Sequence, residues 1–306
     1  MAATVTVVFP IFAVILIGWL ARRVSFIDEA AVRGLREVAF RLVLPALLFS
    51  SMISAPPIDL LGVATVYFGA CFTIFAIGLG IGRLLGLSLA RSTMLGLNAC
   101  YGNTLMVGVP VSVAAFGTDA LPPILTIIAL HSGTLLPLAG VLIEADAGGR
   151  RSPAAVAAGI LKGAGRNPVI LAILAAFLWR ATGVTLPAPF VGTLKLLGAA
   201  GIPLALLVLG ASLPPPDRGA LGIETVIAVS LKLLALPALV FAFGSWAGLP
   251  SLPLAVATLA AATPTGANAF LLAHRNDELI AISAGTVLVT TVLSVLTLGA
   301  LVAMLG

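Results

Sequence analysis

Two stretches decide the fold of this chain: 97-LNACYGNTLMVGVPVSVAAFG-117 and 259-LAAATPTGANAFLLAH-274. Each is apolar overall, yet each carries a proline among Gly, Thr, Asn or Ser residues in mid-segment. A proline removes a backbone donor and obstructs the preceding turn, which interrupts a helix inside the apolar segment. Because proline is favoured at the first helical position, we expect Pro110 and Pro264 to begin the second halves of two broken helices. A simple kink at each proline is the alternative.

The composition around these stretches is that of a membrane protein. The 306 residues are 60% hydrophobic and 9% charged, with a mean hydropathy of +1.21, which excludes a water-soluble fold. The formal charge of +5 is dispersed, so no nucleic-acid-binding face is predicted. Cys71 and Cys100 occur singly in apolar stretches, without a CxxC motif or a partnering His. Neither a disulfide, a metal site nor a cofactor is therefore predicted.

Ten apolar segments are long enough to be membrane-spanning helices, because a helix needs roughly 20 residues to cross the hydrocarbon core. Open strands cannot satisfy their backbone groups in lipid, which leaves helices as the interpretation. The predicted segments are 4–21, 38–55, 60–82, 92–117, 120–143, 168–186, 189–213, 219–247, 249–273 and 279–305.

The basic residues predict an orientation. Twelve of the 16 fall in connections on one side of the membrane, namely Arg22, Arg23, Arg33, Arg36, Arg83, Arg91, Arg150, Arg151, Lys162, Arg166, Arg218 and Arg275. By the positive-inside rule this side is cytoplasmic, and both termini face outward across the cytoplasmic membrane. Arg180 lies on the other side, where it can snorkel to the interface. Arginines follow segment 4–21 rather than precede it, so we expect a retained first span.

Matching Pro and Gly-Thr positions occur in both halves of the chain. The matching positions are Pro10 with Pro168 and Pro45 with Pro203 at an offset of 158, Pro110 with Pro264 at 154, and Gly133-Thr134 with Gly285-Thr286 at 152. These anchors predict a duplication, with repeats at 1–143 and 167–306 and a cytoplasmic linker at 144–166. An odd number of spans inverts the second repeat. The predicted fold is thus all-α, with ten transmembrane helices in two inverted five-helix repeats and broken crossover helices 4 and 9, as in secondary transporters.

The candidate binding site lies where the two breaks meet. Helix N-termini there, near 111–113 and 265–267, offer free N–H groups and partial positive charge that suit an anion. Asn103 and Asn268 can cap the interrupted backbone or hydrogen-bond a carboxylate. The predicted substrate-binding residues are Asn103, Pro110, Val111, Ser112, Pro264, Thr265, Gly266 and Asn268. No catalytic residue and no metal ligand is predicted.

Ionisable residues inside the apolar segments are energetically costly, so each of them needs a structural or functional explanation. Lys232 costs on the order of 3 kcal/mol there unless it is paired or hydrated. It can supply countercharge to the breaks, bond broken-helix carbonyls, or lose its proton. His131 can relay protons or serve in packing, and Glu224 is expected to be solvated near the cytoplasmic end. The segments around the breaks hold no Asp or Glu, which argues against a cation–proton antiporter.

The stretches GNTLMVGVPVSVAAFG, IPLALLVLGASL, LKLLALPAL and ATPTGANAFLLAHR, in this order and spacing, resemble the auxin efflux carrier family. That family includes bacterial malonate- and malate-carrier-like members, and the resemblance covers essentially the whole chain. It implies that spans 3–5 and 8–10 form a transport domain, that spans 1, 2, 6 and 7 form a scaffold, and that the protein is a homodimer. The site residues it carries over are Asn103, Pro110, Pro264 and Asn268, with Lys232 a weaker match. The long central loop of plant members is missing, so auxin is not implied.

The sequence therefore predicts a secondary carrier rather than an enzyme, with a small organic anion, a mono- or dicarboxylate, as substrate. Its other partners are the lipid bilayer and, where transport is coupled, a proton. The alternatives are a sodium-coupled symporter of bile-acid type, an anion channel and a membrane-embedded enzyme. The neutral oxygens available to sodium are those of Asn103, Thr104, Thr263, Thr265 and Asn268. We expect uncoupled or proton-linked movement, because the resemblance does not imply sodium.

Overall fold

The computed structural model describes residues 2–53, 59–146, 155, 159, 162–163, 165–213, 222–273 and 277–306. Throughout these residues the regular structure is helical, apart from one bridge of extended backbone between Gly102 and Thr265. The all-α class is therefore confirmed. The helices of the first half are α1 (Ala2–Arg23), α2 (Glu29–Val38), η1 (Ala39–Val43), α3 (Leu44–Met52), α4 (Leu60–Leu84), α5 (Leu89–Cys100), η2 (Thr104–Gly108), α6 (Val109–Phe116), η3 (Gly117–Ala120) and α7 (Leu121–Asp146).

The second half is equally helical. Its described elements are α9 (Pro168–Ala181), α10 (Ala188–Ala199), α11 (Gly201–Ala211), α12 (Ile223–Ser230), η5 (Leu231–Ala235), α13 (Leu236–Trp246), α14 (Ser251–Ala261), α15 (Ala267–Ala273) and α16 (Asp277–Leu305). Most of the predicted linker 144–166 lies outside the described residues.

Five helical runs of the described chain are long and apolar enough to cross a membrane: Leu60–Leu84, Thr104–Asp146, Ala188–Ala211, Ile223–Trp246 and Ile282–Leu305. Pro168–Ala181 and Ser251–Ala261 are shorter apolar helices. This composition is that of a helical membrane protein. The arrangement as ten spans in two inverted repeats stays a prediction.

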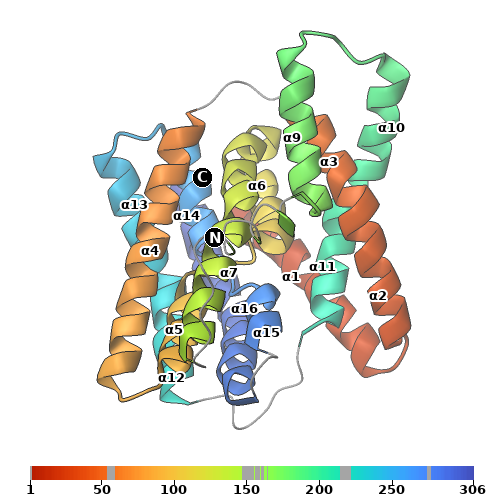
Figure 1. Cartoon of the computed structure of the whole chain (residues 1–306). Helices are drawn as coiled ribbons and strands as arrows, with labels where there is room; N and C mark the ends of the chain where they lie inside the picture. The colour runs from red at the N-terminus through yellow and green to blue at the C-terminus, as the bar shows by residue number, and fades with distance from the viewer. Residues whose placement is uncertain are drawn as a thin grey trace.

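The helices form two groups that stand side by side (Figure 1). In one group α3 packs on α9 and α10, and α1 packs on α11. In the other, α4 packs on α5 and α13, α13 packs on α14, and α5 packs on α7. The groups meet where α16 and α6 contact α1 and where η2 contacts α11. The site described below lies along the contact between the two groups.

Glycines set the close crossing of α1 and α11. A Cβ on Gly18 would lie 2.2 Å from the carbonyl oxygen of Leu207, and one on Gly210 would lie 1.9 Å from that of Ile15. No larger residue fits, because small residues are what let two helix backbones approach this closely in a membrane. The crossing fixes α11, whose C-terminal end borders the cavity described below.

Three turns of π-helix each end next to a proline. In η1, η2 and η5 the N–H that follows the turn donates to the carbonyl five residues earlier, as Val109 does to Thr104. The next residue is Pro45, Pro110 or Pro237. A proline cannot donate to the turn before it and would collide with a regular α-helical carbonyl, and the wider π-turn shifts the hydrogen-bond register around it. The helix therefore continues through each proline.

This accommodation corrects the predicted position of the first break. The non-helical residues are Tyr101–Asn103, and Pro110 sits within helical backbone seven positions after Asn103. The half-helix begins at Thr104, where the Asn103 side chain accepts a hydrogen bond of 3.2 Å from the Met106 N–H. In the second half, Pro264 lies inside the non-helical stretch 262–266, and α15 begins at Ala267. Neither proline starts a half-helix, because capping and the π-turn decide the boundary.

Candidate functional site

The two breaks pair with each other directly. The Asn103 N–H donates to the Pro264 carbonyl at 2.7 Å, and the Gly266 N–H donates to the Tyr101 carbonyl at 3.0 Å. These bonds satisfy backbone groups that a broken helix leaves exposed inside an apolar region. The pairing requires glycine on both sides. A Cβ on Gly102 would lie 2.5 Å from Thr263 Oγ1, and one on Gly266 would lie 2.6 Å from the Tyr101 ring.

An aromatic pair supports the first break. His131 Nε2 accepts a hydrogen bond of 3.0 Å from the Gly102 N–H, and its ring stacks on Tyr101 with centroids 4.6 Å apart. Because Nε2 is the acceptor, the proton of the neutral ring sits on Nδ1. That nitrogen is buried and has no hydrogen-bond partner among the described residues. His131 therefore holds the backbone of the break in place.

Hydroxyl groups support the second break. The Thr265 N–H donates to Thr290 Oγ1 at 2.9 Å, and Thr265 Oγ1 donates to the Asn98 carbonyl at 2.8 Å. Ser283 Oγ donates to Asn98 Oδ1 at 2.9 Å. These buried bonds tie the break to α5 and α16, as buried polar groups must find partners in an apolar interior.

Lys232 caps the end of a half-helix. Its side chain is fully buried, and Nζ donates to the carbonyl of Ala261, the last residue of α14. The same amine lies 3.2 Å from the position a Cβ on Gly102 would occupy, so it reaches both breaks. The four ion pairs formed among described residues do not include it. A basic group at a helix C-terminus complements the carbonyls and the dipole there.

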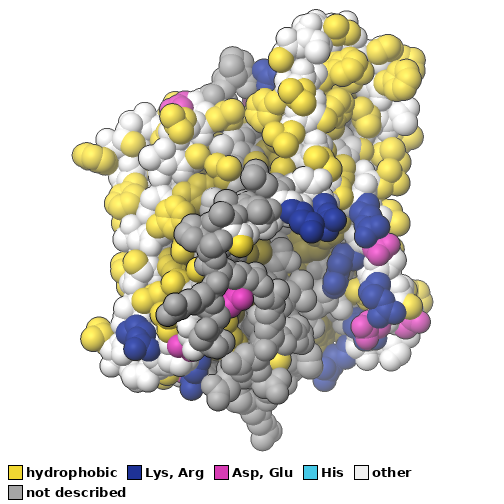
Figure 2. Space-filling model, in the orientation of Figure 1, with side chains coloured by type: hydrophobic (Ala, Val, Ile, Leu, Met, Phe, Trp, Pro, Cys, Tyr) yellow, Lys and Arg dark blue, Asp and Glu magenta, His cyan; other side chains and the backbone are white. Residues whose placement is uncertain are grey.

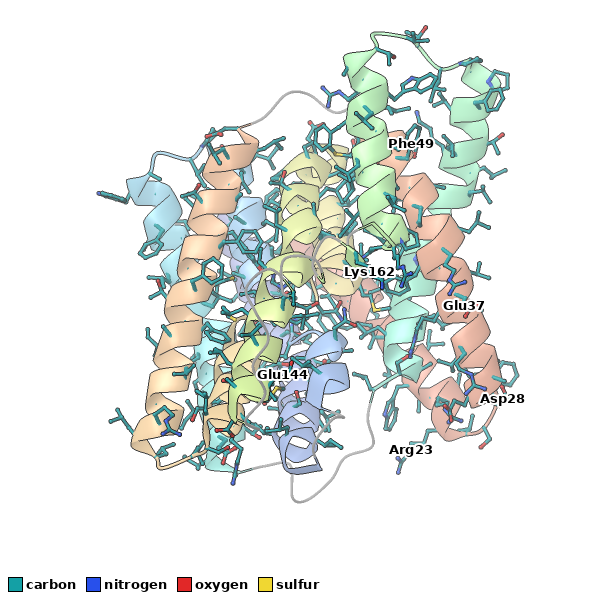
Figure 3. The ribbon with its side chains drawn as sticks, viewed as in Figure 1. Arg23, Asp28, Glu37, Phe49, Glu144 and Lys162 are labelled. Carbon is teal, nitrogen blue, oxygen red and sulfur yellow. The ribbon has the colours of Figure 1, made fainter. Side chains whose placement is uncertain are left out.

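A cavity of about 490 Å³ opens beside the paired breaks. Its described lining comprises Arg36, Glu37, Phe40, Arg41, Tyr101, Gly102, Asn103, Thr104, Leu105, Met106, Ile128, His131, Asn167, Val169, Ile170, Leu209, Ser212, Gly266, Ala267 and Asn268. Figure 3 shows Glu37 part-way along the helix formed by α2 and α3, between Asp28 near one end and Phe49 towards the other. The size suits a small ligand.

The structure brings together part of the predicted site. Asn103, Gly266 and Asn268 line the cavity, and so does His131. Asn268 is exposed to it and donates through Nδ2 to the Tyr101 hydroxyl at 3.2 Å. The predicted residues absent from the described lining are Pro110, Val111, Ser112, Pro264, Thr265 and Lys232. All six are buried.

Two N-terminal turns border the cavity. The turn from the first break is not the one expected near Val111. The lining includes Thr104 and Leu105 at the start of η2, and Ala267 and Asn268 at the start of α15. The first turn of a helix leaves N–H groups without intrahelical partners, which attracts anions. The shift from 111–113 to 104–105 follows from the earlier start of the half-helix.

The two arginines of the lining were missed as site residues by sequence reasoning. It used Arg36 for orientation and left Arg41 inside the predicted segment 38–55. Arg36 donates to Ser212 Oγ at 2.8 Å, and Arg41 lies 4.0 Å from Glu37. Glu37 is the single acidic residue in the described lining. Figure 2 shows Lys and Arg side chains gathered over the part of the surface where α2 lies, with acidic side chains among them. Thus basic groups outnumber acidic ones around the cavity.

An apolar helical bundle with a cavity beside two paired helix breaks is typical of the class of membrane transport proteins. The sequence model of a family described as "Membrane transport protein" matches residues 3–302. The chain belongs to this family, and the resemblance to auxin efflux carriers is confirmed.

Two relatives match over almost their full length. A protein of Rhizobium meliloti (strain 1021) named "Putative malonate transporter" is 28% identical over 302 residues, covering 97% of this chain and 94% of the relative. An "Uncharacterized transporter" of Methanothermobacter thermautotrophicus (strain Delta H) is 25% identical over 315 residues, covering 97% of both chains. Both names agree with a transporter in a membrane.

Proposed function

We propose that this protein is a secondary carrier that moves a small organic anion, with malonate as the first candidate, across the cytoplasmic membrane by alternating access. The observation that carries the proposal is the cavity at the paired breaks, bordered by two helix N-termini, three Asn residues and two arginines. Such a lining offers hydrogen-bond donors and positive charge to a carboxylate. The name of the 28% identical relative supports malonate in particular.

The proposed architecture is ten spans in two inverted repeats, with both termini outside. In it the group containing α4 to α7 and α12 to α16 moves in the manner of an elevator against the group of α1 to α3 and α9 to α11. The packing of α3 on α9 and α10, and of α4 on α5 and α13, supports the division. We propose a homodimer, as the family resemblance implies, in which the two protomers meet through the group of α1 to α3 and α9 to α11.

The proposed substrate site comprises Asn103, Gly266 and Asn268 with the N-terminal turn at Thr104. Pro110, Val111, Ser112, Pro264 and Thr265 act behind it by shaping the two half-helices, and Lys232 supplies positive charge at the crossover. His131 keeps the first break in register through its bond to Gly102. No step of this mechanism needs a cofactor or a catalytic residue.

Counterflow in proteoliposomes tests the proposal. Vesicles loaded with unlabelled malonate and diluted into labelled malonate accumulate the label transiently when an alternating site carries both molecules. A channel gives no acceleration from the trans side, and an enzyme converts the label to another compound. Either of these results overturns the proposal of a carrier.

Imposed gradients test the coupling. Moving one elementary charge through 100 mV is worth about 2.3 kcal/mol, or roughly a fifty-fold concentration ratio. An uncoupled anion carrier therefore exports its substrate across an inside-negative membrane. We expect uptake to respond to voltage or pH and to proceed without sodium, and a strict sodium requirement would favour the symporter instead.

A further inference from the structure

The helix formed by α2, η1 and α3 directs two arginines into one cavity. Arg36 and Arg41 both line it, together with Glu37 and Phe40. Successive residues of an α-helix are about 100° apart, so positions 36, 37, 40 and 41 share one broad face of the helix. The π-turn at Ala39–Val43, in which the Leu44 N–H donates to the Ala39 carbonyl, lies along the same stretch and accommodates Pro45.

The first of these arginines is held across the cavity wall. Arg36 donates to the Ser212 hydroxyl at 2.8 Å, which links α2 to the end of α11. A hydroxyl leaves the charge of the guanidinium uncompensated and several of its N–H donors free for a ligand. Arg36 has no ion pair among the described residues.

The second arginine is only loosely paired. Arg41 lies 4.0 Å from the Glu37 carboxylate, both side chains are largely exposed, and exposed pairs of this kind contribute little. By contrast, Arg33 makes a closer pair of 3.0 Å with Glu29 and is not part of the described lining. The same helix thus carries two arginines that line the cavity and one, Arg33, that lies outside its described lining.

We infer that Arg36 and Arg41 form a second anion subsite, and that the substrate is a short dicarboxylate held at both ends. One carboxylate lies at Asn103, Asn268 and the turn beginning at Thr104; the other lies between the two guanidinium groups. Planar guanidinium groups bind carboxylates bidentately, and two of them offer more positive charge than a monocarboxylate would need. This assignment rests on the proposed function. It adds to the proposed site a part that selects dicarboxylates over monocarboxylates.

Equilibrium binding to purified protein tests the inference, with malonate and its monomethyl ester as probes. The two probes share one carboxylate and nearly the same shape, so their affinity ratio reports the second charge alone. For the unchanged protein we expect malonate to bind at least tenfold more tightly than the half-ester. In Arg36→Gln and in Arg41→Gln that ratio should fall towards one, with half-ester binding retained.

The controls separate selectivity from folding. Half-ester binding in the same preparation shows that a variant is folded. Arg33→Gln should keep the full ratio, because Arg33 pairs with Glu29 and is outside the described lining. Arg36→Lys and Arg41→Lys should give intermediate ratios, because lysine keeps the charge without the planar fork.

The outcomes also separate the two proposals. If the unchanged protein binds the half-ester as tightly as malonate, or if both Gln variants keep the ratio, the second subsite is wrong while the carrier stands. Equal loss of both probes in the Gln variants means that the arginines support the fold rather than select the substrate. If the unchanged protein binds neither probe, the malonate assignment under the proposed function fails as well.

Discussion

The two breaks are alike in their backbone and different in their surroundings. Each interrupts an apolar helix, each needs a glycine for the close approach, and each donates one N–H to a carbonyl of the other. At the first break the support is an imidazole, His131, stacked on Tyr101. At the second it is the amine of Lys232 together with the hydroxyls of Thr265 and Thr290.

This difference shows which features both repeats keep after a duplication and which features can differ between them. The backbone pairing is a steric requirement, and both halves meet it with the same small residues. The charge is not required twice, since one basic group lies near both breaks. At the offset of Gly133 and Gly285, His131 of the first half corresponds to Ser283 of the second, which donates to Asn98 instead. The predictions below test the likeness and then the differences.

The largest effect is expected where the two backbones touch. Gly102→Val and Gly266→Val each place atoms where a Cβ alone would approach within 2.5 to 2.6 Å. Overpacking of this kind costs about 3 kcal/mol at the upper end of its usual range. We expect both variants to melt at clearly lower temperature and to lose counterflow.

Gly80→Val is the matched control, because a Cβ there meets nothing within 4 Å. It should melt close to the unchanged protein. Wild-type thermal stability in Gly102→Val would contradict the close pairing of the breaks.

The next effect concerns the cation of the second break. Lys232→Met leaves the Ala261 carbonyl without its donor, which costs about 1–3 kcal/mol for a buried acceptor. It also removes positive charge near Gly102. We therefore expect a large loss of anion transport together with only a moderate loss of thermal stability. Counterflow normalised to folded protein measures the first quantity and thermal unfolding the second.

The controls for this variant are Lys232→Arg, which keeps a basic donor, and Lys195→Met on the exposed face of α10. Lys195→Met should be silent in both assays. Full transport by Lys232→Met would show that the cation of the second break serves packing alone.

The two asparagines distinguish capping from binding. Asn103→Ala removes the acceptor for the Met106 N–H, and the loss of such a cap costs about 1 kcal/mol of stability. Asn268 is exposed in the cavity, so Asn268→Ala should leave stability unchanged. Both should weaken malonate binding about tenfold or more, since a hydrogen bond to a charged group contributes about 1.5–3 kcal/mol. Unchanged affinity in both variants would place the substrate elsewhere.

The smallest effect is expected at the aromatic support of the first break. His131→Phe keeps a ring against Tyr101 but loses the acceptor for the Gly102 N–H, worth about 0.5–1.5 kcal/mol. Tyr101→Phe removes the hydroxyl that Asn268 contacts and should change stability less. Thermal unfolding of the two variants side by side ranks them, and the reverse order would mean that His131 is not what holds the break.

Much of the fold was predictable from local sequence. Apolar runs and turn residues predicted the helices, and the breaks were expected in the two stretches where they occur. The exact boundary at the first break was not, because Pro110 looks like a helix start on local grounds. The wider turn before it lets the helix continue through the proline, and Asn103 caps the half-helix at Thr104 instead.

The site was predictable in its centre and not at its edge. Asn103, Gly266 and Asn268 stood out as polar or small residues beside the breaks. Arg36 and Arg41 gave no such signal, since Arg36 in a connection is accounted for by topology and Arg41 lies three residues inside the predicted segment 38–55. Their position in the cavity depends on how this helix packs against distant elements, as in the contact of Arg36 with Ser212, 176 residues away in the chain.

The sequence by itself determined that this chain is an apolar, helical membrane protein with two polar interruptions, because hydropathy and residue type act over neighbouring residues. It also carried the family, through motifs spread along nearly the whole chain. Only the tertiary structure decided which side chains surround the cavity and which lie buried behind it. Those positions follow from packing between distant helices, whose register depends on glycine crossings and π-turns and not on any local pattern.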